Sequence, residues 1–140
     1  MSSMAARSPS AAFLFRLDLQ SGVPVYRQIM DQVCAGMASG SLTAGEQLPT
    51  VRQLAVDLAI NPNTVARAYR ELELGGLLDT HQGTGSFISA QKIRRPDAER
   101  ERQLIQIVGD CVSRAGAMGF SIDDVIEQLR KSVSESNRRR

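Results

Sequence analysis

The chain alternates stretches of strand-like and of helical hydrophobic periodicity. Residues 13–19 carry apolar side chains at every second position, which predicts a half-buried strand. Pro24 suits the first turn of a helix because its missing N–H costs nothing there, and Gly40 is a suitable C-terminal stop. The helix expected between them has an apolar face spaced by three and four residues: Tyr26, Ile29, Met30, Val33, Cys34 and Met37.

Two further helices are predicted to meet at a tight turn. Thr50 is a candidate N-cap for a helix of about two turns. Pro62 disfavours helical geometry at Asn61, and Asn61 is itself a good cap for a third helix, which Gly75 and Gly76 would end. The apolar faces are Val51, Leu54, Ala55 and Leu58 in the first of these helices and Val65, Ala68, Tyr69 and Leu72 in the second.

The remaining chain predicts a hairpin and two more helices. Strands beginning at Leu77 and returning at Phe87 flank a glycine-containing turn at residues 81–85. A basic stretch ending in proline indicates a linker at residues 91–97, and a helical hairpin is expected over 98–134. Within it, Gly116 and Gly119 mark the turn and Ser121 and Asp124 resemble a capping box. Residues 1–12 and 135–140 are expected to be flexible tails.

The composition is that of a globular protein, and it excludes several other classes of protein. Its 140 residues are 42% hydrophobic and 23% charged, which suffices for a core. Two cysteines and no tryptophan exclude a disulfide scaffold and a multi-cysteine metal cluster, and Cys34 and Cys111 are expected to be buried thiols. The sequence offers no membrane-spanning stretch and no secretory signal, so a cytoplasmic location is expected.

Charge is informative through its placement. The net charge is +2, with 15 arginines against 2 lysines. Residues 1–90 sum to −1, from six arginines and seven acidic residues, so bulk charge does not indicate nucleic acid. Between residues 50 and 70, however, Arg52, Arg67 and Arg70 are opposed only by Asp57. The field there is locally basic.

Three helices followed by a hairpin predict a winged helix-turn-helix over residues 13–90, in a mainly α fold with a small β wing. The second helix of such a motif enters the DNA major groove. Its polar edge must therefore carry groups that read base edges: asparagine pairs with adenine, arginine with guanine, and threonine contacts bases or phosphate. The candidates on this edge are Asn61, Asn63, Thr64 and Arg67.

Four segments carry a resemblance to a known family. Residues 24–29 (PVYRQI), 45–55 (GEQLPTVRQLA), 61–69 (NPNTVARAY) and 83–88 (GTGSFI) together resemble the GntR family of bacterial transcription regulators. The resemblance implies a dimeric, DNA-binding repressor. It also implies that Arg52 contacts DNA from the second helix, that the polar edge of the third helix forms the recognition region, and that Gly83 belongs to the wing.

The 50 residues after the hairpin are too few for the ligand-sensing domains of most relatives, and they resemble the tail of the YtrA-like subgroup. In that subgroup the tail dimerises, and transporter genes are common neighbours of the regulator. The physical argument agrees, because a two-helix hairpin is too small to bury two apolar faces by itself. Its neighbour is either a second copy of the chain or its own DNA-binding domain.

Several alternatives stay open at this point. Arg70, beside Glu71, and His81, in the wing, either contact DNA or are ordinary exposed side chains. Asn61 is either a helix cap alone or a cap that also contacts DNA. A winged helix can also be a protein-interaction module without specific DNA binding. No enzyme, cofactor or metal site is indicated, and the sequence does not identify the operator, the regulated genes or an effector.

Overall fold

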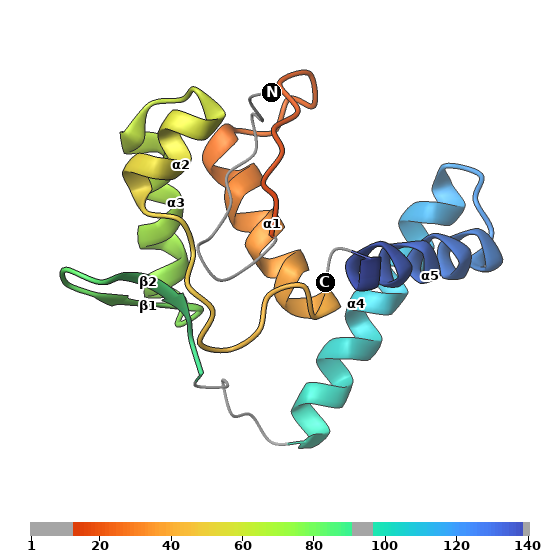
Figure 1. The fold of residues 1–140 in the computed structure, drawn as a ribbon. Helices are drawn as coiled ribbons and strands as arrows, with labels where there is room; N and C mark the ends of the chain where they lie inside the picture. The colour runs from red at the N-terminus through yellow and green to blue at the C-terminus, as the bar shows by residue number, and fades with distance from the viewer. Residues whose placement is uncertain (1–12, 91–96, 139–140) are drawn as a thin grey trace. The chain divides into compact units, whose positions relative to one another are not determined.

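Three helices with a β-hairpin and, after them, two longer helices make up the chain (Figure 1). The computed structural model describes residues 13–90 and 97–138. These residues belong to two compact units. The predicted tail at 1–12, residues 91–96 of the linker predicted at 91–97, and the last two residues of the tail predicted at 135–140 lie outside the described residues. Residue 97 and residues 135–138 are helical, so the linker and the C-terminal tail are shorter than predicted. The elements are α1 (Val25–Ser39), α2 (Val51–Leu58), α3 (Pro62–Leu74), β1 (Leu78–His81), β2 (Gly85–Ile88), α4 (Asp97–Ala117) and α5 (Ile122–Arg138).

The strand predicted over residues 13–19 is wrong, because residues 13–18 are extended but pair with no strand in the described part of the chain. Two glutamines of α1 take the place of a partner strand. The Gln32 Oε1 accepts the Arg16 N–H at 2.8 Å, and its Nε2 donates to the Arg16 carbonyl. Gln28 binds the N–H and carbonyl of Asp18 in the same way, at 2.8 and 2.9 Å. The alternating pattern therefore reported the burial of Phe13 and Phe15 rather than a sheet, and it did not hold to its end, since Leu19 is 78% exposed.

The turn between α2 and α3 follows from its local chemistry. α2 begins with a reciprocal cap, in which Thr50 Oγ1 accepts the Gln53 N–H at 3.1 Å and Gln53 Oε1 accepts the Thr50 N–H at 3.0 Å. It ends at Leu58, and its C-cap, Ala59, is left-handed with a φ of 56°. Asn61 is extended, as the residue before Pro62 should be, and α3 starts there. The two predicted helix boundaries are confirmed.

The apolar faces of α1, α2 and α3 meet in one core. Tyr69 also carries a polar link, because its hydroxyl donates to the Pro49 carbonyl at 2.7 Å. Burial raises the pKa of Tyr69, so this hydroxyl stays protonated and remains a donor. The buried apolar residues are Phe13, Phe15, Ile29, Val33, Leu42, Leu48, Leu54, Ala55, Leu58, Val65, Ala68, Tyr69, Leu72, Leu78 and Ile88.

Both cysteines are exposed, so the prediction of buried thiols is wrong. In α1 the buried positions are Ile29, Val33 and Gly36. Cys34 follows Val33 by one residue and is therefore turned about 100° away from that face. Cys111 lies in α4, which contains no buried residue.

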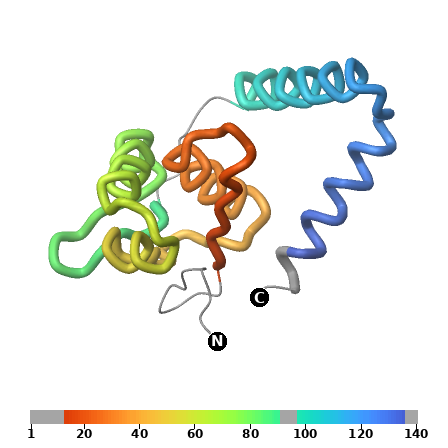
Figure 2. Tube along the Cα trace, turned by 90° about the horizontal axis from the view of Figure 1, so that it is seen from above, coloured from red at the N-terminus to blue at the C-terminus, as the bar shows by residue number. Residues whose placement is uncertain are grey.

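The β-hairpin is joined to the helices through main-chain hydrogen bonds. Residues 45–48, between α1 and α2, run along β2: the Gly45 N–H donates to the Ile88 carbonyl at 2.8 Å, and the Leu48 N–H donates to the Ser86 carbonyl at 2.9 Å. The base of the wing is thus fixed, while its turn reaches out beyond the three helices (Figure 2).

The second unit is the helical hairpin α4–α5. Its turn contains Gly119 at φ 89°, and the predicted cap is present: Asp124 and Ser121 exchange side-chain-to-backbone hydrogen bonds at 2.9 and 3.1 Å. α5 continues to Arg138, beyond the predicted end of the hairpin at residue 134. None of the helices in the described residues combines the length and apolarity that crossing a lipid bilayer requires.

Replacing Tyr69 by phenylalanine is expected to lower the free energy of unfolding by about 1–2 kcal/mol, because the Pro49 carbonyl loses its buried donor. Urea denaturation followed by circular dichroism measures the change. Tyr26→Phe is the matched control, since the Tyr26 hydroxyl makes no hydrogen bond within the described residues. Equal stability of the two variants would show that the Tyr69 hydroxyl contributes nothing.

Candidate nucleic-acid interface

The first turn of α3 presents a polar edge. Asn61 accepts the Asn63 N–H on its Oδ1 at 2.8 Å, so it is a structural cap. Asn63 is exposed and Thr64 half-buried. Their side chains make no hydrogen bond with any described residue, which leaves their donors and acceptors available. The first N–H groups of α3 are already paired, since the Asn63 N–H binds the Asn61 side chain and the Thr64 N–H donates to the Asn61 carbonyl at 3.0 Å.

Three arginines add positive charge around this edge. Arg67 and Arg70 are exposed on α3, and Arg52 is exposed on the first turn of α2. None of the three forms an ion pair with a described residue; the ion pair that is present joins Glu127 and Lys131 in α5. Unpaired arginines on an exposed face attract anions, phosphates among them.

Arg67 has one well-defined neighbour. Its guanidinium carbon lies 3.8 Å from the centroid of the Tyr26 ring, within the range of a cation–π interaction. Tyr26 is in the first turn of α1, and its half-buried ring also packs against the core. Sequence analysis placed Tyr26 only on an apolar face, since no local pattern links two residues 41 positions apart.

The wing carries the other two predicted site residues. His81 ends β1, and its ring packs edge-on against Phe87 with 5.4 Å between centroids. Gly83 lies in the turn at φ 85°, a left-handed conformation that favours glycine. Both are exposed and within three residues of each other.

Gln47 braces this turn and was not found by sequence analysis. Its Nε2 donates to the Thr84 carbonyl at 2.8 Å. The next residue, Gly85, has φ 125°, and a Cβ there would stand 2.8 Å from that same nitrogen. The glycine therefore lets the Gln47 amide reach the wing.

The predicted residues thus fall on three elements. Asn61 caps α3; Asn63, Thr64 and Arg67 lie in its first two turns, and Arg70 follows one turn later. Arg52 is on α2, and His81 and Gly83 are in the wing. An exposed helix edge of this kind, flanked by a glycine-containing hairpin, has the composition of a surface that binds a nucleic acid duplex.

A family model described as bacterial regulatory proteins, gntR family, matches residues 25–88. The regulator Rv1152 of Mycobacterium tuberculosis is 47% identical over 114 residues, which cover 81% of this chain and 89% of that protein. The chain belongs to the GntR family. It also resembles the repressor YtrA of Bacillus subtilis, with 41% identity over 76 residues, or 54% of this chain and 58% of that one.

Solved structures agree with this assignment. YtrA from Sulfolobus acidocaldarius, a GntR-family transcription factor, is 31% identical with a TM-score of 0.51, and the match covers 87% of this chain and 98% of that one. A GntR-family regulator from Listeria monocytogenes is 30% identical with a TM-score of 0.57, over 81% and 98%. The protein is thus a YtrA-like GntR transcriptional regulator with a winged helix-turn-helix DNA-binding domain.

Asn61→Ala in this GntR regulator is expected to lower the free energy of unfolding by about 1 kcal/mol, because the start of α3 loses its cap. Asn61→Ser restores an oxygen that can accept the same N–H, so its stability should return to within about 0.5 kcal/mol of the parent. Urea denaturation of both variants measures this. If serine is as destabilising as alanine, the cap is not what Asn61 contributes.

Proposed function

We propose that this regulator is a homodimeric repressor that binds an inverted-repeat operator through the polar edge of α3. The observation that carries the proposal is the set of unpaired donors on that edge: Asn63, Thr64 and Arg67 have no polar partner among the described residues. In a helix-turn-helix this edge enters the major groove. We assign Asn63 to adenine, Arg67 to guanine, and Thr64 to a base or a phosphate.

The other predicted residues take positioning roles in this proposal. Arg52 and Arg70 contact phosphates on either side of the groove, because both are exposed and unpaired. His81 and Gly83 bring the wing to the adjacent backbone. Asn61 already caps α3, and Asn61→Ser, which keeps a cap while removing the amide, tests whether it also contacts DNA. The half-sites are expected about 10 bp apart or at a multiple of that spacing.

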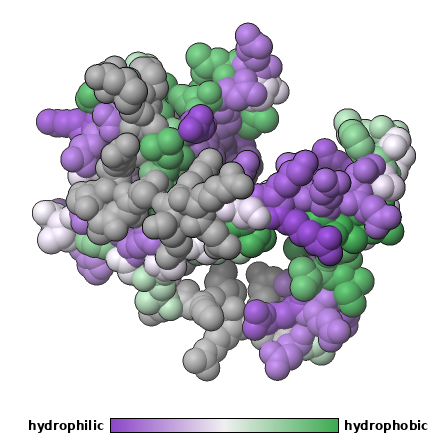
Figure 3. Space-filling view, turned by 45° about the vertical axis from the view of Figure 1, so that its right-hand side comes forward, coloured by the Kyte–Doolittle hydropathy of each residue, from purple (hydrophilic) through white to green (hydrophobic). Residues whose placement is uncertain are grey.

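We assign dimerisation to the α4–α5 hairpin. Its apolar side chains remain exposed: Phe120 is 55% and Leu129 61% accessible, and hydrophobic residues show on the surface of this unit (Figure 3). Exposed apolar surface of this extent in a small unit is typical of an interaction site. The large exposed side chains are Leu104, Ile105, Ile107, Val108, Met118, Phe120, Ile122, Ile126, Leu129 and Val133.

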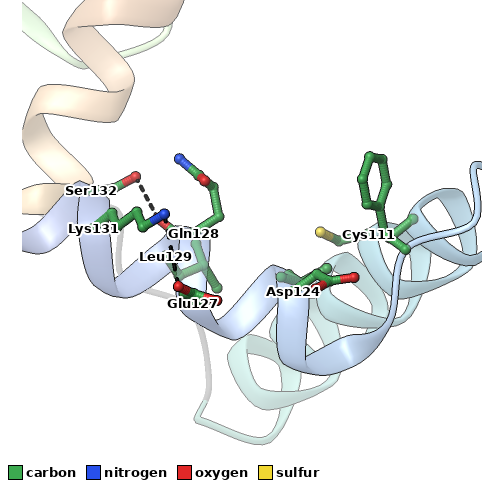
Figure 4. A pocket seen from close by; sticks show the side chains of 10 residues that line it. Cys111, Asp124, Glu127, Gln128, Leu129, Lys131 and Ser132 are labelled. Carbon is green, nitrogen blue, oxygen red and sulfur yellow. Dashed lines mark hydrogen bonds and ion pairs between the residues drawn. The ribbon is translucent and has the colours of Figure 1, made fainter.

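A pocket of about 590 Å³ lies within the hairpin (Figure 4). Apolar groups line it from both helices, among them Ala115 of α4 and Val125 and Leu129 of α5. The Glu127–Lys131 ion pair, at 3.8 Å, stands on its polar side. We propose that the apolar face of a second copy fills this pocket, since an identical hairpin offers an equally unpaired face.

Repression is proposed because the relative YtrA carries that name. A dimer on a promoter blocks polymerase by occupying the same DNA, and this requires no cofactor or enzymatic step. A transporter operon is the proposed target, by analogy with YtrA-like regulators, and the cytoplasm is the proposed place of action. The relatives reported above are named as transcriptional regulators or transcription factors, which agrees with a non-enzymatic role.

The central test is operator binding by the full chain. The promoter upstream of the gene is searched for an inverted repeat, which is then footprinted with the purified protein. Arg67→Ala is expected to weaken binding to that operator by about 1–3 kcal/mol, because a bidentate base contact is lost. Arg100→Ala, at an exposed position of α4, is the control and should bind as the parent does. Unchanged affinity of Arg67→Ala would remove this residue from the site.

Salt dependence separates DNA binding from the alternative, a protein-interaction module. Binding through phosphates releases counterions, so the operator affinity should fall steeply between 50 and 200 mM salt, by about tenfold or more. An apolar protein interface would respond little. Absence of operator binding at every salt concentration would reject the repressor and favour the protein-interaction module.

Leu129→Asp is expected to convert the dimer to a monomer, because it places a charge in the proposed seam. Light scattering measures the change in mass, and operator affinity should fall with it, since two half-site contacts are no longer joined. Ser134→Asp adds the same charge at an exposed position outside the pocket and should remain dimeric. A monomeric parent, or a dimeric Leu129→Asp, would place the interface elsewhere.

A further inference from the structure

The Arg67 side chain is oriented by a residue outside the helix-turn-helix. Its guanidinium carbon stands 3.8 Å above the ring of Tyr26, and α1 and α3 pack closely against one another. No carboxylate of the described residues pairs with Arg67, so the ring is the specific partner that the structure gives this cation. An exposed arginine would otherwise sample many rotamers.

Stacking of this kind leaves the guanidinium free to bind. The five N–H donors lie in the plane of the group and point outward from its edge, whereas an aromatic ring occupies only its face. An arginine stacked on tyrosine can therefore still form two parallel hydrogen bonds to a guanine. The Tyr26 ring is suited to hold it, because it is half-buried and packed against the core.

We propose that Tyr26 is a positioning residue for base recognition: its ring holds the Arg67 guanidinium in the orientation in which it reads guanine. This rests on the proposed operator binding. Tyr26 acts through Arg67 and not through its own hydroxyl, which has no hydrogen-bond partner in the described part of the chain. The recognition surface then includes the first turn of α1 as well as α3.

The experiment uses the full-length protein and a double-mutant cycle on operator DNA. Tyr26→Phe keeps the ring and should bind within about twofold of the parent, whereas Tyr26→Leu removes the ring and should bind roughly 3- to 30-fold more weakly. Tyr26→Leu should also discriminate less against an operator in which the guanine is replaced. In an Arg67→Ala background, Tyr26→Leu should cause no further loss.

Each contrary result has a separate meaning. An equal loss from Tyr26→Leu in both backgrounds would make Tyr26 a purely structural residue, and a loss in Tyr26→Phe as large as in Tyr26→Leu would show a hydroxyl contact to DNA. Either result overturns the proposal while leaving operator binding intact. Failure of the parent to bind any operator would instead reject the proposed function.

A measurement on the free protein keeps the proposal testable if Tyr26→Leu folds poorly. The ring current of Tyr26 should shift the Arg67 Nε–Hε proton resonance upfield, in the parent and in Tyr26→Phe alike. Tyr26→Met, a flexible replacement without a ring, should return that resonance to the position of an exposed arginine. An unshifted resonance in the parent would show that the stack does not form in solution.

Discussion

The orientation of α3 depends on the burial of one of its faces. Val65 and Ala68 are completely inaccessible and Leu72 nearly so, in a core shared with α1 and α2. Rotating the helix by about half a turn would expose these apolar side chains and bury Arg67 without a polar partner, and both changes would cost free energy. The hydrophobic face therefore fixes which residues form the outer edge. Core packing thus determines which side chains of α3 are available to a partner.

Several polar interactions hold the surroundings of α3 in place. The Tyr69 hydroxyl, bonded to the Pro49 carbonyl, ties the middle of the helix to the loop before α2. Residues 45–48 bond to β2, and Gln47 reaches the wing turn through Thr84. The loop between α1 and α2 thus contacts both the helix and the wing. Through these hydrogen bonds, the loop holds α3 and the wing together, although both are distant from the loop in sequence.

The features of the fold that depend on local chemistry could be predicted from the sequence. The Asn61–Pro62 pair correctly predicted the start of α3, and the spacing of apolar residues in α2 and α3 correctly predicted their buried faces. The predictions failed where a residue's partner lies far away in the sequence. Alternation at 13–19 could not reveal that glutamines of α1 replace a strand, and the helical pattern around Cys111 could not show that α4 buries nothing. Among the functional candidates, the stack of Arg67 on Tyr26 was beyond reach for the same reason.

The spacing of the two glutamines in α1 matches the spacing of the two residues that they bind. Gln28 and Gln32 are one helical turn apart, about 6 Å along the axis, while Asp18 and Arg16 are two extended residues apart, about 6.6 Å. The spacing along the helix nearly equals the spacing along the extended segment. The earlier glutamine binds the later residue of the segment, so the two run in opposite directions, as strands do in an antiparallel pair. A helix with an amide side chain on each successive turn can therefore set the register of an extended segment without a sheet. Moving either glutamine by one position would swing its amide around the helix and leave the segment unaligned.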